Sequence, residues 1–149
     1  MISLKKGNRG FTIVELLIVI VVIGILAALV IVTYNGIQQK ARDTERKTDI
    51  NALHGQLEAY QAQNGRYPTL ADMNNATFRA ANLKGLDPEA LKDPKGTAQT
   101  LAGTAGANVY SYVATPANCD NTPANGDCLQ YTLTATLEGG GTYAKASLN

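Results

Sequence analysis

The 149-residue sequence has few of the side chains from which most active sites are built. It contains no tryptophan, one histidine and two cysteines, which is too few for most metal and nucleophile constellations. Charged residues make up 17%, against about 25% in an average globular protein. The 13 basic and 12 acidic residues nearly cancel to a net charge of +1, so the basic surface of a dedicated nucleic-acid-binding protein is missing.

Proline is absent before Pro68, and one long apolar run occupies much of that stretch. The run extends from Phe11 to Val32 and is interrupted by Thr12, Glu15 and Gly24. A bilayer core takes about 20 residues of helix, so the run is long enough to cross it. A simple cytosolic globular protein is therefore not expected.

A short basic segment, MISLKKGNRG, precedes the apolar run. Positive charge before an apolar helix keeps that end in the cytoplasm and sends the rest of the chain across the membrane. A secretory signal would show an apolar stretch of about 7–15 residues and then a small-residue cleavage site. The apolar run here is longer than that of a secretory signal, so physical reasoning alone predicts an uncleaved signal anchor.

Two residues suggest more than a plain anchor. Gly10 lies at the boundary of the apolar run, where a peptidase at the cytoplasmic face could reach it, and Glu15 lies inside the run. A carboxylate at the middle of a membrane helix costs about 2.5–3.5 kcal/mol, and less near its end. Glu15 is either a tolerated interfacial residue or a carboxylate that awaits a cation in the membrane or in an assembly.

The segment GFTIVELLIVIVVIGILAALV resembles the amino-terminal signature of type IV prepilins and pseudopilins. The resemblance implies that an inner-membrane prepilin peptidase cleaves between Gly10 and Phe11 and methylates the new amine of Phe11. It also implies that Glu15 pairs with the Phe11 amine of a neighbouring subunit, because a buried carboxylate and ammonium are tolerable only together. Many pilins carry a proline near the end of the run, where this chain has Val32.

The sequence predicts an α+β, pilin-like fold, in which a long amino-terminal helix packs against a small antiparallel β-meander. Residues 1–10 are the expected leader, and residues 11–32 the transmembrane or filament-core helix. Residues 33–64 continue that helix with an amphipathic pattern, which Asn64-Gly65 ends. Residues 65–149 are the expected globular head. One face of the helix carries an apolar stripe at helical spacing: Ile50, Leu53, Leu57 and Tyr60.

Seven charges crowd between Lys40 and Asp49. We expect a solvent-exposed helix face there, with Arg42–Glu45 and Asp43–Lys47 pairs that each add about 0.2–0.5 kcal/mol. Pairing of the same charges between the subunits of a filament is the alternative.

The predicted head begins with short helices and loops. Thr69 and Asp72 have the spacing of a capping box, and Asp87-Pro88 is typical of a helix start. Residues 96–107 are rich in glycine, alanine and threonine, which predicts a surface loop. Strands are expected at residues 109–115, 129–137 and 142–148. Alternation in the second strand directs one set of side chains to the core: Leu129, Tyr131, Leu133, Ala135 and Leu137.

Cys119 and Cys128 flank a polar loop between the first two predicted strands. The membrane signal sends this region outside, where disulfides persist, so we expect the two cysteines to be bonded. A metal site is the rival, but two cysteines without a nearby histidine supply too few ligands. The family resemblance supports the disulfide, since many pilins carry such a loop near the carboxy terminus.

The remaining candidates for chemistry are sparse. His54 has no recognisable nucleophile or orienting partner, which favours a structural role. Asp93, in the sequence Asp-Pro-Lys-Gly, together with Asp120 and Asp127 could supply oxygen ligands for calcium, and some pseudopilins with this element bind calcium. The chain lacks an EF-hand pattern, so we expect no metal and no cofactor.

The leading functional hypothesis is a non-enzymatic structural subunit of a type IV pilus-like filament that serves adhesion, twitching motility or DNA uptake. Its implied partners are copies of itself, the prepilin peptidase, the pilus or secretion assembly machinery, and a cell-surface or DNA ligand. The implied location is the inner membrane before assembly and an extracellular filament afterwards. The alternatives are a pseudopilin of a type II secretion or competence system and a signal-anchored binding module outside the cytoplasm.

Overall fold

The computed structural model describes residues 10–149, so the basic leader ahead of Gly10 lies outside the described residues. Two compact units divide the chain after Gln38. Residues 10–38 are called the apolar unit below, and residues 39–149 the head unit. The helix α1 (Ile13–Asn64) contributes residues to both.

The apolar unit consists of the start of α1 and the residues just before it. Every one of its side chains is exposed, including Phe11, which is 83% exposed. Among the described residues, α1 is the one helix that is long and apolar enough to cross a membrane, judged by length and composition. An exposed apolar surface of this extent marks a site of contact with a membrane or with other protein.

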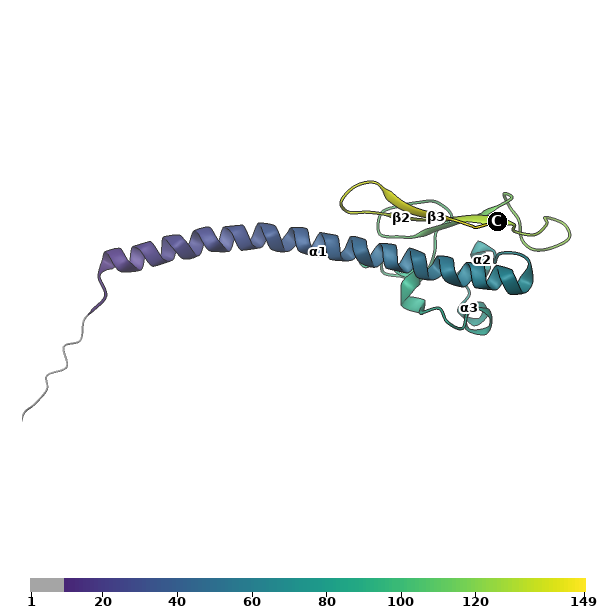
Figure 1. The fold of residues 1–149 in the computed structure, drawn as a ribbon, viewed down its shortest axis with the longest axis horizontal. Helices are drawn as coiled ribbons and strands as arrows, with labels where there is room; N and C mark the ends of the chain where they lie inside the picture. Colours follow the sequence, from purple (N-terminus) through teal and green to yellow (C-terminus); the bar gives the residue numbers. More distant parts are fainter. Residues whose placement is uncertain (1–9) are drawn as a thin grey trace, which may run out of the picture. The chain divides into compact units, whose positions relative to one another are not determined.

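The head unit has a three-stranded antiparallel sheet that lies along the carboxy-terminal half of α1 (Figure 1). The sheet contains β1 (Ser111–Thr115), β2 (Gln130–Thr136) and β3 (Thr142–Ala146), in that order. The predicted stripe of α1 and the predicted inner face of β2 meet in one core, confirming the α+β fold. Its members include Ile50, Leu53, Leu57, Tyr60, Tyr131, Leu133 and Ala135.

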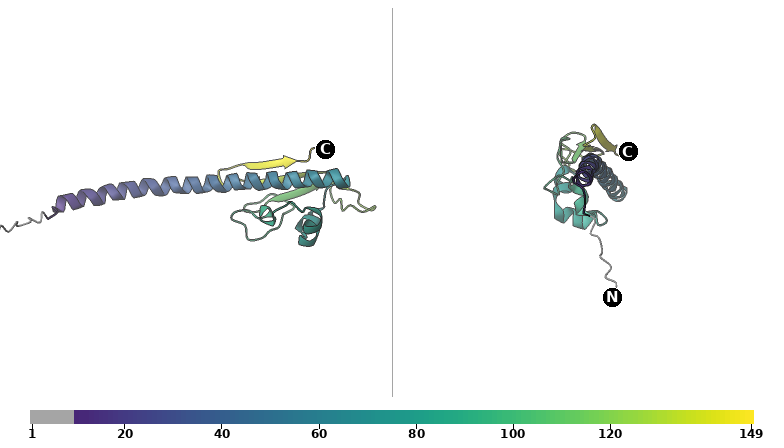
Figure 2. Two further views of the ribbon diagram at one scale, coloured as in Figure 1. Left: turned by 60° about the horizontal axis from the view of Figure 1, so that its bottom comes forward. Right: turned by 90° about the vertical axis from the view of Figure 1, so that its left-hand side faces the viewer.

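The long helix ends where the sequence predicts. The amide of Gly65 donates to the Gln61 carbonyl oxygen at 2.7 Å, and Gly65 has φ +72°, a conformation that glycine adopts without a Cβ clash. Three short elements follow: α2 (Leu70–Asn74), α3 (Ala76–Asn82) and the 3₁₀ turn η1 (Pro88–Leu91). Figure 2 shows α3 and β3 on different sides of α1. The capping box of Thr69 and Asp72 and the cap of Asp87 on η1 are confirmed.

Two expectations for the head are wrong. Leu129 lies outside β2 and is 57% exposed, so the strand begins one residue later than predicted and leaves this side chain outside the core. The stretch 96–107 is not wholly a surface loop. Leu101 is 4% exposed within the core. The Ala102 amide donates to the Tyr110 carbonyl oxygen, and the Ala102 carbonyl oxygen accepts from the Tyr112 amide, which docks the loop beside β1.

Candidate functional site

The first turn of α1 brings Thr12 and Glu15 together. Glu15 Oε2 accepts hydrogen bonds from the Thr12 amide and from the Thr12 hydroxyl, both at 2.8 Å. In return the Glu15 amide donates to Thr12 Oγ1 at 3.2 Å. This reciprocal arrangement is a capping box, which satisfies donors that the start of a helix would leave unpaired.

The capping box gives Glu15 a role within its own chain that the sequence analysis missed. The signal was present, because a threonine followed three residues later by a glutamate before an apolar run is the signature of such a cap. Gly10 and Phe11 precede the cap and are exposed. The residues predicted for processing and assembly therefore lie together at the start of α1.

The charged segment of α1 is not a purely solvent-exposed face as expected. Arg46 is 1% exposed, and its guanidinium makes two hydrogen bonds to the Asp93 carboxylate, at 2.6 and 2.9 Å. It also donates to Asp43 at 2.8 Å and to Glu138 at 2.9 Å. Arg42 adds two hydrogen bonds to Glu138, at 2.7 and 2.8 Å. In place of the predicted pairs with Glu45 and Lys47, Arg42 pairs with the distant Glu138, and Asp43 pairs with Arg46 on the same helix.

This cluster holds the β2–β3 turn to α1. The Asp43 carboxylate accepts the amides of Glu138 and Gly139, at 2.8 and 2.9 Å. Hydrogen bonds from Arg42, Lys95 and Arg46 hold the pKa of Glu138 far below its usual range. Since those contacts favour the ionised form, Glu138 stabilises the head above its ordinary pKa, and that stabilisation is lost as the pH falls.

The charge of Asp49 is less well neutralised than the charges of the cluster around Arg46. Its Oδ2 accepts a hydrogen bond from the Tyr110 hydroxyl at 2.7 Å. Burial raises the pKa of Asp49 to about 6, and the charges of Glu45, Asp93 and Asp87 act in the same direction. Asp49 therefore favours the protonated form far more than an exposed aspartate does.

His54 joins a group of polar side chains around Glu58. His54 Nδ1 lies 2.6 Å from the Tyr131 hydroxyl, which donates to Glu58 Oε1 at 2.8 Å. The Tyr67 hydroxyl donates to the other carboxylate oxygen at 3.0 Å, and the Leu148 amide reaches Glu58 at 3.3 Å. Glu58 therefore connects three separate segments to α1, and the Tyr131 hydroxyl gives His54 an orienting partner that the sequence did not reveal.

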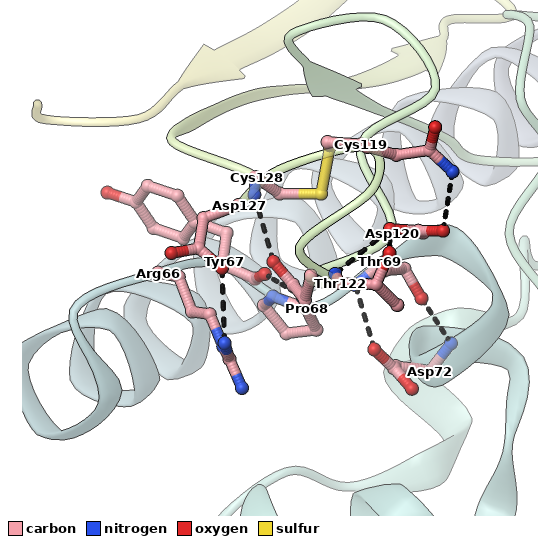
Figure 3. Close-up of a disulfide and its surroundings, with 12 residues drawn as sticks. Arg66, Tyr67, Pro68, Thr69, Asp72, Cys119, Asp120, Thr122, Asp127 and Cys128 are labelled. Atoms are coloured by element: carbon pink, nitrogen blue, oxygen red, sulfur yellow. Dashed lines mark hydrogen bonds and ion pairs between the residues drawn. A yellow bond between two sulfur atoms is a disulfide. The ribbon is translucent and has the colours of Figure 1, made fainter.

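The structure joins Cys119 and Cys128 in a disulfide, the pairing expected from the sequence (Figure 3). The enclosed loop is fastened to the end of α1, since the Tyr67 amide donates to the Cys128 carbonyl oxygen at 2.8 Å. Arg66 and Asp127 form an ion pair at 3.1 Å, and Asn121 donates to the Tyr67 carbonyl oxygen at 3.0 Å. The loop is thus an ordered part of the head surface.

The three aspartates considered for calcium have separate partners. Asp93 is held by Arg46, and Asp127 by Arg66. Asp120 accepts from Thr122 within the disulfide loop (Figure 3). Within residues 10–149, the structure assembles no group of three or more histidine, cysteine, aspartate or glutamate side chains that could hold a metal.

Comparisons with known proteins find one family model and several similar proteins. The family described as the prokaryotic N-terminal methylation motif matches residues 5–31. The type II secretion system core protein G of Dickeya chrysanthemi is 42% identical over 66 residues, which are 44% of this chain and 43% of that protein. The core protein G of Klebsiella pneumoniae is 38% identical over 91 residues, 61% of this chain and 63% of that protein.

A pilus protein is also similar. The type IV major pilin PilA of Myxococcus xanthus is 38% identical over 65 residues, which cover 44% of this chain and 30% of the pilin. No solved structure matches the chain. The chain spans about half the length of the core G proteins it matches. The methylation motif, the apolar helix that carries it and the small antiparallel sheet are features that make this chain similar to type IV pilins and type II secretion core G proteins.

Proposed function

We propose that this chain is a pseudopilin-type structural subunit, which polymerises through residues 11–64 into a fibre of a secretion or competence machine. The observation that carries the proposal is the methylation motif lying on an apolar helical surface that is exposed throughout. Two of the three relatives described above are secretion core G proteins, which places the pseudopilin role ahead of the surface pilus expected at first.

In this proposal the chain is anchored in the inner membrane by residues 11–32 and carries a removable leader at residues 1–10. A prepilin peptidase cuts after Gly10 and methylates the amine of Phe11. The assembly machinery then draws the subunit out of the bilayer into the fibre. Burial of the exposed apolar side chains between neighbouring helices then replaces their contacts with lipid and keeps them out of water, at about 25 cal/mol for each Å² that would otherwise be exposed to water.

Order in the proposed fibre comes from Glu15. It is the sole charged residue between Phe11 and Ile37, so an ion pair with a neighbour's Phe11 amine is specified at one position along the apolar surface. A buried carboxylate without a cation is costly, whereas the pair is tolerated, which disfavours other registers. The head unit, with residues 65–149 as its globular part, is then displayed on the fibre surface.

A surface pilus subunit is the second candidate, and the disulfide loop favours it. The loop is exposed and ordered, and a disulfide bond closes it, as expected of a filament surface in contact with the extracellular environment. The similarity to the Myxococcus pilin agrees with this reading. Asp120 and Asp127 are the charged side chains of the loop, so its surface suits a cell-surface ligand better than the phosphates of DNA.

Intact mass and amino-terminal sequencing of the native protein test both candidates. The two measurements are made separately on membranes and on material sheared from the cell surface. A chain that starts at methylated Phe11 and stays with the membranes supports the pseudopilin role. The same processed chain in abundance in the sheared fraction supports the pilus role. A chain that keeps its leader in both fractions contradicts both and leaves a signal-anchored module.

A further inference from the structure

A hollow of about 260 Å³ in the head unit is lined by residues of α3, the turn after it and η1. Small and apolar side chains form much of its wall, among them Ala80, Leu86 and Pro88. The charged residues that line it, Arg79 and Lys84, are both basic. The hollow shares no residue with the Thr12–Glu15 cap or with the disulfide loop.

Arg79 is a buried cation that has no carboxylate partner within the described part of the chain. The residue is 8% exposed, and no aspartate or glutamate among residues 10–149 forms an ion pair with it. Its Nη1 donates to the Met73 carbonyl oxygen at 2.6 Å, at the end of α2. A guanidinium has five N–H donors, so this contact leaves most of them available.

The available donors of Arg79 are not sealed within the core. In residues 10–149 no fully buried side-chain nitrogen or oxygen lacks a hydrogen-bond partner. The remaining N–H groups of Arg79 therefore reach accessible space, and the hollow is the space that Arg79 lines. The neighbouring carboxylate of Glu89 is already engaged, since it accepts from Gln99 at 2.5 Å and lies 3.8 Å from Lys92.

A guanidinium on a largely buried side chain is stabilised when an anion neutralises it. Lys84 is exposed and adds a second positive charge at the same hollow. The apolar wall beside these donors favours the short carbon chain of an organic acid over a fully hydrated inorganic anion.

We propose that this hollow binds a carboxylate group, through paired hydrogen bonds from the Arg79 guanidinium and the charge of Lys84. Arginine presents two parallel N–H donors that match the two oxygens of a carboxylate. The carboxylate comes either from an acidic side chain of a second copy of this chain or from a free small organic acid. The binding chemistry is the same for both sources and does not depend on the proposed fibre.

The test is an NMR titration of the full chain in detergent with sodium acetate at constant ionic strength. The Arg79 Nε–Hε signal and the Ala80 amide are expected to shift and saturate. Arg79→Lys, which keeps the charge but loses the paired donors, should weaken binding about tenfold. Lys84→Met should weaken it about threefold, and Lys40→Met, an exposed lysine on α1 outside the hollow, should leave it unchanged.

Several results would overturn the proposal: no saturable shift near Arg79, equal responses of the Lys84→Met and Lys40→Met variants, or inorganic phosphate binding as tightly as acetate. If Arg79→Lys disturbs folding because the contact with Met73 is lost, the comparison of Lys84→Met with Lys40→Met still tests the proposal. Sedimentation of the same samples identifies the source. Acetate that dissociates oligomers indicates an acidic side chain of a second copy, and acetate that binds without changing the oligomers indicates a free acid.

Discussion

The two units of this chain differ in whether their apolar side chains are buried within the chain, although α1 supplies residues to both. The head unit buries Ile50, Leu53 and Leu57 completely against its own sheet. The apolar unit leaves every side chain exposed. Helix propensity does not distinguish them, since one helix passes through both without a break. The difference is that the head carries its own packing partner, whereas the apolar unit depends on lipid or on other subunits.

The two units also differ in how a charged side chain is neutralised. In the head, buried Arg46 is neutralised by carboxylates from its own chain. In the apolar unit, Glu15 has Thr12 as a hydrogen-bond partner but no cation among the described residues. The charge of Arg46 is thus neutralised within the chain, whereas the charge of Glu15 is left for another molecule to neutralise.

The largest effect should come from removing that charge. We expect Glu15→Val to reduce recovery of assembled fibres at least about tenfold, because no carboxylate remains to pair with a neighbouring amine. The variant should still enter the membrane, since valine costs less than glutamate in an apolar helix. Shearing and membrane fractionation with quantitative immunoblotting measure both effects.

Glu15→Gln is the matched control for charge. Glutamine can still accept hydrogen bonds from Thr12, so it keeps most of the helix cap while losing the negative charge. We expect it to fail in assembly as Glu15→Val does. Normal assembly of Glu15→Gln would show that the cap matters and the ion pair does not.

Within the head, Arg46→Met should be the most damaging change. It leaves the buried Asp93 carboxylate without its partner, which costs about 3–5 kcal/mol. Arg42→Met is the matched control, because Arg42 is partly exposed and its pair with Glu138 is worth about 0–1 kcal/mol. Urea unfolding of the full chain in detergent, followed by near-ultraviolet circular dichroism, compares them. Equal losses in the two variants would contradict the buried ion cluster.

Replacing both cysteines by serine should have the next largest effect. The disulfide closes a short loop, with a sequence separation of 9, which is worth about 2.7 kcal/mol in the chain-entropy model. The same unfolding experiment, run with the oxidised parent chain as reference, measures the loss. Because the bond lies wholly in the head unit, membrane insertion should not change. A loss of insertion would show that the two units are not energetically separate.

The smallest predicted effect is a gain. Burial raises the pKa of Asp49 to about 6, so its ionised form opposes folding at neutral pH. Asp49→Asn keeps an acceptor for the Tyr110 hydroxyl and removes the charge, which should raise the Tm by about 5 °C at pH 7. Below the ordinary aspartate pKa both chains are neutral at this position, and the gain should disappear. Melting curves at pH 7 and pH 3 test it, and a gain of equal size at both would exclude the charge as the cause.

Local patterns in the sequence predict much of the fold. The spacing of Ile50, Leu53 and Leu57 gives a helix face, and the alternation at Tyr131 and Leu133 gives a strand face. Each pattern depends on a few neighbouring residues, so it can be recognised without knowing the tertiary structure. The Thr12–Glu15 cap belongs to the same class, since its signature is equally local.

The features that sequence reasoning missed depend on distant residues. Arg46 is buried where it binds Asp93, which lies 47 residues further along the chain. The sequence around Arg46 does not predict that contact. Leu101 is buried because a glycine-rich loop docks beside β1. Leu129 follows the strand alternation but lies where no other element covers it. In each case the burial of the side chain depends on which distant segments pack against it, and the local sequence does not reveal that packing.

The capped state of Glu15 has a kinetic consequence for growth of the proposed fibre. Because Thr12 holds Glu15 Oε2 through two hydrogen bonds, the carboxylate is already oriented before an incoming amine arrives. The amine can approach Oε1, which accepts no hydrogen bond from the described residues. Subunit addition then needs no rearrangement of the first turn of α1, so ordering of this side chain does not slow elongation.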